Sequence, residues 1–216
     1  MSFGRTNYTQ YEMKVFTDLK QTYPQSVISP SHLRIENKIV NAKQAYDFPV
    51  LMTGSEVSTE VKLDKNDLFR VTRMSMFVYQ RNVALADEGI QPLQTYPNAS
   101  YFTTGTAWVK SHLETLYNGR LTIKRGTTVI LENFNTRNFR EVSITQQTGA
   151  TNASSQNLDA GTVQLVPAFN LPGREQVSIQ GLFPTFSGIL WASDAAGLEN
   201  RVVMMLQGFL VKGANI

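Results

Sequence analysis

The sequence contains no cysteine and only two histidines among its 216 residues. A chain without cysteine has no disulfide framework, no thiol nucleophile and no thiolate ligand for a metal. The histidines, His32 and His112, belong to no His-Glu-x-x-His metal motif, and no Gly-x-Ser-x-Gly, Walker or Gly-x-Gly-x-x-Gly motif accompanies them. We therefore expect a protein that is not an enzyme, with no catalytic residue, no cofactor and no metal site.

The chain also lacks long runs of charge and long apolar runs. Its net charge is +3, 17% of its residues are charged, and no Lys/Arg run is longer than two residues. A coat protein that neutralises a genome through a basic arm carries such a block, so no specific nucleic-acid binding is expected. No apolar run approaches the ~20 residues of a transmembrane helix, so no membrane span is expected.

Threonine and other sheet-forming residues are abundant instead. The sequence has 21 threonines, together with many Val, Ile, Phe and Tyr, and these residues favour pleated sheet. The length suits one β-rich domain with a substantial core. Residues 33–39, 57–63, 68–79, 162–166, 175–180 and 201–211 have the pattern of strands. Ser29-Pro30-Ser31 is interpreted as a turn.

Two of these strands carry a more specific signal. The apolar phase changes within residues 68–79, from odd positions to even ones, and this predicts a β-bulge near Thr72-Arg73 or a strand buried on both faces. Residues 202–206 are continuously apolar, which predicts a central strand covered on both sides.

The stretch 106–144 predicts a short helix that leads into a hairpin. Apolar residues recur at helical spacing after Thr106, a suitable N-cap, and Gly119 is expected to end the helix in the left-handed conformation. Residues 121–124 and 127–131 then alternate as two strands around a tight turn, and residues 139–144 are a third strand after a polar loop. Such a unit cannot bury both faces, so the rest of the chain must supply a second sheet.

The N-terminal residues 1–25 are predicted to form an amphipathic helical arm. Thr9-x-x-Glu12 resembles a capping box, and the segment closes at Pro24. Its apolar stripe consists of Tyr8, Tyr11, Val15, Phe16 and Leu19. The helix either packs on its own domain or docks on another subunit. We take the second alternative as the working hypothesis, with residues 26–216 as the β-sandwich domain.

Two long loops interrupt the predicted strands. Residues 91–105 have no apolar period and display Tyr96, Tyr101 and Phe102, which either contact another subunit or cover the core of their own domain. Residues 146–161 are small and polar, typical of a long exposed loop.

Three stretches resemble bacteriophage virion proteins of the jelly-roll type. They are Asn-Asp-Leu-Phe-Arg-Val-Thr-Arg at 66–73, Leu-Glu-Thr-Leu-Tyr-Asn-Gly-Arg-Leu-Thr-Ile at 113–123, and the closing apolar strand at 199–211. The resemblance implies an antiparallel jelly-roll-like β-sandwich, mainly β, with an N-terminal helix and one short internal helix. It also implies a structural protein of the virion that builds or decorates the capsid through contacts with copies of itself or with other virion proteins, as a homo-oligomer.

A second class of function stays open at this point. A β-sandwich can also be a carbohydrate- or receptor-binding module, in which Tyr96, Tyr101, Phe102 or Trp191 would stack on sugar rings. Such a module needs exposed, coplanar aromatic rings, and the sequence does not say which rings are exposed.

Overall fold

Two antiparallel sheets of four strands make up the protein in a computed structural model, which describes residues 8–85, 92–99, 102, 106–142, 161–185, 188–193 and 195–214. The first sheet has the order β1-β8-β3-β6 and the second the order β2-β7-β4-β5. Their bounds are β1 Val27–Lys38, β2 Ala45–Pro49, β3 Leu68–Asn82, β4 Arg120–Arg125, β5 Thr128–Asn135, β6 Thr162–Pro172, β7 Val177–Leu182 and β8 Leu198–Lys212.

The strand order is that of an eight-stranded jelly roll. The chain changes sheet at almost every connection, and only β4 and β5 are consecutive neighbours within one sheet. Consecutive strands therefore face each other across the core, while neighbours within a sheet come from distant parts of the chain. This is the double Greek-key arrangement of jelly rolls. The prediction of a mainly β, antiparallel sandwich with few helices is confirmed.

Strand β8 lies in the middle of the first sheet, between β1 and β3, as the apolar run at 202–206 predicted. Val202, Met204 and Leu206 point into the core between the sheets. Val203 is also fully buried, on the outer face, whereas Met205 is only partly buried there. The strand is covered on both sides over most of its central part.

Strand β3 contains the bulge that the change of phase predicted. Its pairing with both β6 and β8 shifts in register between Val71 and Arg73. The extra residue, Thr72, brings Val71 and Met74 to the same inner face although their spacing is odd, and both are fully buried. A bulge is therefore the physical reason that the apolar pattern changes from odd to even positions.

Several local predictions were wrong. Pro30 lies inside β1, not in a turn, because β1 is an edge strand, and an edge strand tolerates a proline that donates no ladder hydrogen bond. The segment 57–63 forms only isolated bridges, at Val61 and Leu63. Strand β5 continues to Asn135, and Phe139 ends a 3-10 helix, Thr136–Phe139 (η2), so no strand begins at residue 139.

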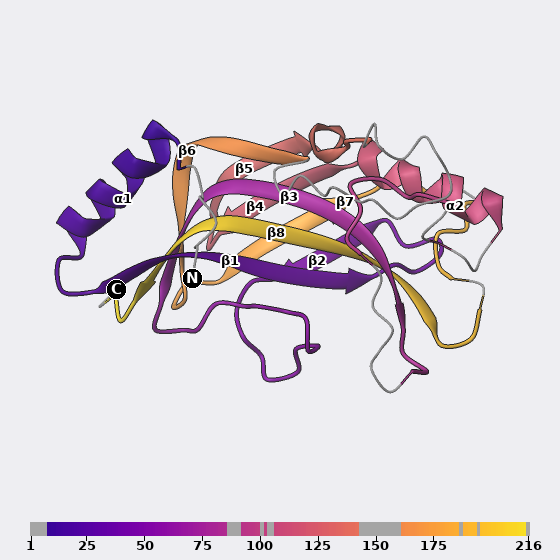
Figure 1. Cartoon of the computed structure of the whole chain (residues 1–216), viewed down its shortest axis with the longest axis horizontal. Helices are drawn as coiled ribbons and strands as arrows, with labels where there is room; N and C mark the ends of the chain where they lie inside the picture. The colour runs from indigo at the N-terminus through magenta and orange to yellow at the C-terminus, as the bar shows by residue number, and fades with distance from the viewer. Residues whose placement is uncertain are drawn as a thin grey trace, which may run out of the picture.

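Two helices occupy opposite ends of the sandwich (Figure 1). The N-terminal helix α1, Gln10–Thr22, has the predicted capping box, in which Thr9 and Glu12 bond to each other's backbone N–H. The second helix, α2, Ala107–Leu113, is capped by Thr106 as predicted and continues as a 3-10 helix, Glu114–Asn118 (η1). Across the described ranges, no helix is both long enough and apolar enough to cross a bilayer.

Helix α1 packs on its own domain. Val15 and Leu19 are 6% and 1% exposed, in a cluster with Leu68, Phe209 and Val211 from the ends of β3 and β8. This small core lies on the outer face of the first sheet. The hypothesis of an arm docked on another subunit is therefore not needed to cover the apolar stripe, because the chain itself covers it.

Candidate functional site

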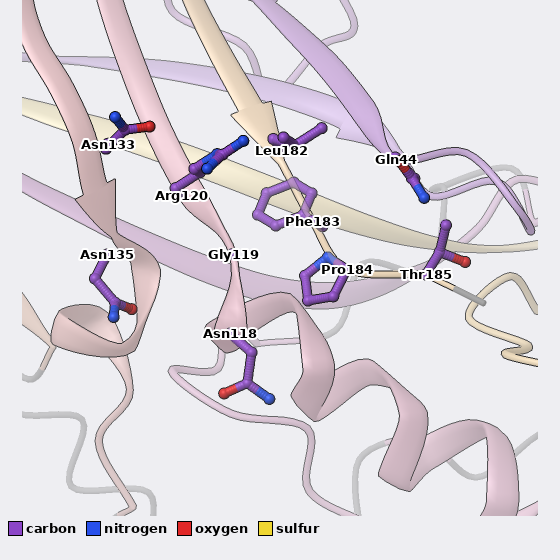
Figure 2. A pocket seen from close by; sticks show the side chains of 10 residues that line it. All are labelled: Gln44, Asn118, Gly119, Arg120, Asn133, Asn135, Leu182, Phe183, Pro184 and Thr185. Atoms are coloured by element: carbon purple, nitrogen blue, oxygen red, sulfur yellow. The ribbon is translucent and has the colours of Figure 1, made fainter.

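An open pocket of about 500 Å³ lies at one end of the second sheet (Figure 2). Its walls come from the start of β4, the end of β5 and the segment that follows β7. It is lined by Gln44, Asn118, Gly119, Arg120, Asn133, Asn135, Leu182, Phe183, Pro184 and Thr185. The volume falls within the range of small-molecule sites, roughly 300–1,000 Å³.

The backbone at Gly119, on one side of the pocket, packs closely against Leu182 and Phe183 on the other side. A Cβ at Gly119 would lie 2.5 Å from Phe183 Cδ1 and 2.7 Å from the Leu182 carbonyl oxygen, so only glycine fits there. Gly119 has an extended backbone, with φ −91° and ψ −170°, and not the left-handed conformation that the sequence suggested. The glycine is required by close packing.

The buried side chain of Thr136 fixes the backbone around Gly119. Thr136 is fully buried, and its hydroxyl accepts from the Gly119 N–H and donates to the Leu116 carbonyl, each at 2.8 Å. The Thr136 N–H in turn donates to the Gly119 carbonyl at 3.0 Å. The pocket wall is thus formed before any ligand arrives, which reduces the entropy cost of binding.

The polar side chains that line the pocket are one guanidinium, several amides and the hydroxyl of Thr185. Arg120 is exposed, and within the described residues no carboxylate pairs with its guanidinium. Asn135 uses its Oδ1 to accept the Arg137 N–H at 2.8 Å, which leaves its side-chain N–H groups for other partners. Asn133 has a positive φ of 52°, which is uncommon for a residue with a side chain. Among the described residues that line the pocket, none has an acidic side chain.

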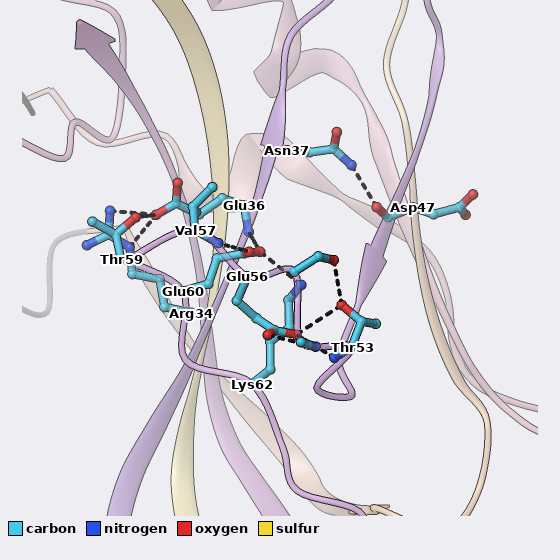
Figure 3. A network of polar contacts seen from close by, with 12 residues as sticks. Arg34, Glu36, Asn37, Asp47, Thr53, Glu56, Val57, Thr59, Glu60 and Lys62 are labelled. Atoms are coloured by element: carbon cyan, nitrogen blue, oxygen red, sulfur yellow. Dashed lines mark hydrogen bonds and ion pairs between the residues drawn. The ribbon is translucent and has the colours of Figure 1, made fainter. Parts of the chain in front are cut away.

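A second polar cluster lies on the outer face of the first sheet, around the carboxylate of Glu36 (Figure 3). The Glu36 side chain is fully buried, and it accepts hydrogen bonds from Arg34 Nε and from the Thr59 hydroxyl, each at 2.8 Å. Arg201 Nε lies 3.1 Å from the same carboxylate and forms an ion pair with it. Tyr79 donates its hydroxyl to the same carboxylate. The carboxylate of Glu36 therefore links strands β1, β3 and β8 with the loop that carries Thr59. Because donors and cations surround both of its oxygens, its role is structural.

The cluster also fastens the segment that crosses from β2 to β3. The Glu36 N–H donates to Glu60 Oε1 at 3.1 Å, and Lys62 Nζ lies 3.3 Å from the same oxygen. Arg34 and Val61 exchange two backbone hydrogen bonds at the free edge of β1. The segment 50–63 is therefore held to the sandwich by charge-assisted bonds in place of a regular ladder.

Two pKa values in this cluster differ from their ordinary values. Burial, together with the bond to Glu36 and the charge of that carboxylate, raises the pKa of Tyr79 to about 12. Burial alone would raise the pKa of Glu199, but Lys38 at 2.8 Å and Arg201 at 2.9 Å outweigh it and lower that pKa. The shift of Tyr79 therefore follows mainly from burial, and that of Glu199 from its ion pairs.

The residues predicted as subunit contacts on the N-terminal helix are mostly used within the chain. Val15 and Leu19 are buried as described above, and Phe16 lies 5.6 Å from the Phe209 ring. The Tyr11 hydroxyl donates to the Leu165 carbonyl at 2.9 Å and accepts the Ala168 N–H at 2.5 Å. Tyr8 is the most exposed of the five, at 38%.

Two aromatic residues of the loop 91–105, Tyr96 and Phe102, also face the core. Phe102 is 1% exposed inside the main core, and Tyr96 is partly buried against it. Trp191 is fully buried as well. Tyr101 lies outside the described residues. Phe102 and Trp191 therefore cannot form the exposed platform for sugar stacking that was considered, because core packing has taken their rings.

One exposed apolar patch lies at the end of the sandwich that carries α2. Trp108 is 60% exposed and Leu190 is 45% exposed. His112 joins them, since its ring centroid lies 4.1 Å from the Trp108 ring and its Nδ1 accepts the Leu190 N–H at 3.0 Å. His112 is therefore a buried structural residue, as the sequence indicated, and it supports an exposed tryptophan.

Comparison with known proteins gives no family to which the chain can be assigned. The sequence matches no protein-family model, and none of the curated proteins resembles it. The functional argument therefore depends on the geometry of the chain itself.

Sequence reasoning missed the pocket residues. Asn118-Gly119 was interpreted only as a helix stop, and Asn133 and Asn135 were placed in a polar loop. A signal was present, because Asn133 and Asn135 follow the second strand of the predicted hairpin and so fall near the start of its first strand, where Arg120 lies. The hairpin that brings Arg120 near these asparagines was predicted, whereas the segment after β7 that completes the pocket is placed there by the tertiary fold.

Proposed function

We propose that the protein is a non-enzymatic structural protein of a bacteriophage virion, which builds or decorates the capsid through contacts between subunits. The observation that carries the proposal is the strand order β1-β8-β3-β6 and β2-β7-β4-β5. Virus capsid domains are one of the main classes built on this jelly roll. The resemblance of three sequence stretches to jelly-roll virion proteins supports the same assignment.

An open sheet edge supports contact between copies of the chain. Strand β5 is the last strand of the second sheet, and no strand of the described residues pairs with its outer side. Its first half, Thr-Val-Ile-Leu at residues 128–131, contains no charged residue and no proline, the residues that commonly protect an edge. Val129 on this strand is 44% exposed. Such an edge favours pairing with a strand of another subunit.

The exposed patch of Trp108 and Leu190 supplies a second contact surface. Tryptophan is prominent among the residues that dominate binding energy at interfaces. This patch is at the end of the sandwich that carries α2, whereas β5 offers a sheet edge, so one subunit can contact two neighbours. Two separate contact surfaces are what a shell or a decoration lattice requires.

The test is the mass of the purified protein in solution, compared with 24.2 kDa for one chain. We expect oligomers or larger assemblies by mass photometry and analytical ultracentrifugation between about 1 and 100 μM, a range of ordinary subunit affinities. Val129→Lys, which places a charge on the β5 edge, should shift the protein toward monomer. Val40→Lys is the matched control, since Val40 is 45% exposed but lies away from β5.

A wild-type chain that stays monomeric over the whole range, and that is also absent from purified particles by mass spectrometry, contradicts a structural role. An equal effect of both lysine variants would show that added charge alone, and not the β5 edge, controls association.

A further inference from the structure

We propose that the pocket between β4, β5 and the segment after β7 binds a sugar that carries a carboxylate, such as a uronic acid. This binding activity goes beyond the proposed structural role and does not depend on it. Of the described residues that line the pocket, Arg120 alone carries a charge, and the side-chain amides of asparagine and glutamine lie around it.

Arg120 differs from most arginines of this chain. Six others pair with carboxylates within 4.0 Å, namely Arg34, Arg70, Arg73, Arg125, Arg140 and Arg201. The Arg120 guanidinium lines an open pocket without such a partner among the described residues. A guanidinium presents a planar fork of donors that matches a carboxylate. Because Arg120 is the one cationic side chain among the described lining residues, a monoanion matches the charge of the pocket better than a dianionic phosphate.

The amides supply what the hydroxyl groups of a sugar require. Asn118, Asn133, Asn135 and Gln44 each combine a carbonyl acceptor with N–H donors, and a hydroxyl group both donates and accepts. Figure 2 shows Asn133 and Asn135 on the side of Arg120, with Gln44 beyond Pro184 on the other side. These groups surround a space large enough for one or two sugar rings at about 500 Å³.

The floor of the pocket explains why charge, and not stacking, is the expected mode of recognition. Pro184 and Leu182 are exposed and offer aliphatic surface to the C–H face of a ring. Phe183 is 1% exposed, so its ring is not available as a platform. A neutral sugar would have only amide bonds and weak aliphatic contact, whereas a uronate adds an ion pair with Arg120.

The experiment measures binding of matched sugars to the full chain by NMR chemical-shift titration. Glucuronate and glucose differ in the carboxylate, and acetate and inorganic phosphate control for simple anions. We expect glucuronate to bind with a Kd on the order of 1 mM, and at least about tenfold more tightly than glucose, acetate or phosphate. The shifts should map to residues around 118–120, 133–135 and 182–185.

A matched pair of variants identifies the guanidinium responsible. Arg120→Gln should lose the preference for glucuronate over glucose, whereas Arg137→Gln should retain it, because Arg137 is exposed nearby but does not line the pocket. Both side chains are exposed, so both variants should melt like the wild type. Binding of free glucuronate or of a trigalacturonate supports the proposal, and the ratio of the two affinities distinguishes a free sugar from a polysaccharide.

Four results would overturn the proposal. These are no binding of any uronate up to 50 mM, equal binding of glucuronate and glucose, equal binding of acetate or phosphate, and equal losses in the two arginine variants. None of these results concerns assembly, so failure here is distinguishable from failure of the proposed structural role.

Discussion

The packing of helix α1 on the first sheet makes a quantitative prediction for Leu19→Ala. Leu19 is 1% exposed in the cluster formed with Leu68, Phe209 and Val211. Truncation of a buried leucine removes its transfer free energy and leaves a cavity, at a cost of about 2–5 kcal/mol. For a domain of this size, 1 kcal/mol lowers Tm by about 2–4 °C, so a loss of about 3 kcal/mol corresponds to about 6–12 °C.

The assay is thermal and urea unfolding of the isolated protein, followed by circular dichroism. Met13→Ala is the matched control, because Met13 lies on the same helix but is 50% exposed. Its effect should stay within about 0.5 kcal/mol. If Leu19→Ala and Met13→Ala unfold alike, the helix does not pack on its own domain in solution, and the alternative of an arm docked on another subunit regains its support.

Three further predictions concern the sheets and the polar cluster. Met204→Asp should lower the free energy of unfolding by several kcal/mol, because it buries an unpaired charge in the core. Met205→Asp, on the outer face, should lower it much less, and equal urea midpoints of the two variants would contradict the assigned faces. Because the pKa of Tyr79 is about 12 in the folded protein and 10 in the unfolded chain, its protonated hydroxyl contributes stability that is fully present below pH 10 and is lost as the pH rises toward 12. Between pH 10 and 12 the free energy of unfolding of Tyr79→Phe should therefore fall by about 2 kcal/mol less than that of the wild type, and parallel pH profiles of unfolding would refute this. Gly119→Ala should cost about 1–3 kcal/mol by urea unfolding, from its close approach to Phe183, and an unchanged midpoint would show that the turn can relax.

The sequence alone determined the features that depend on neighbours along the chain. The capping box of Thr9 and Glu12 and the N-cap at Thr106 follow from local hydrogen bonding. The bulge after Val71 follows from alternation, because a strand with one inner face cannot change phase without an extra residue. Fold class and helix positions were predictable for the same reason.

Only the tertiary structure decided which distant residues meet. Glu36 contacts Tyr79 and Arg201, which lie 43 and 165 residues further along the chain, because β1, β8 and β3 lie side by side in the first sheet. In the second sheet, β7 lies next to β4, which places Leu182 and the residues after it beside Arg120 and builds the pocket. A local pattern specifies which face of a strand is apolar. Which strand lies next to it is decided by the packing of the whole core.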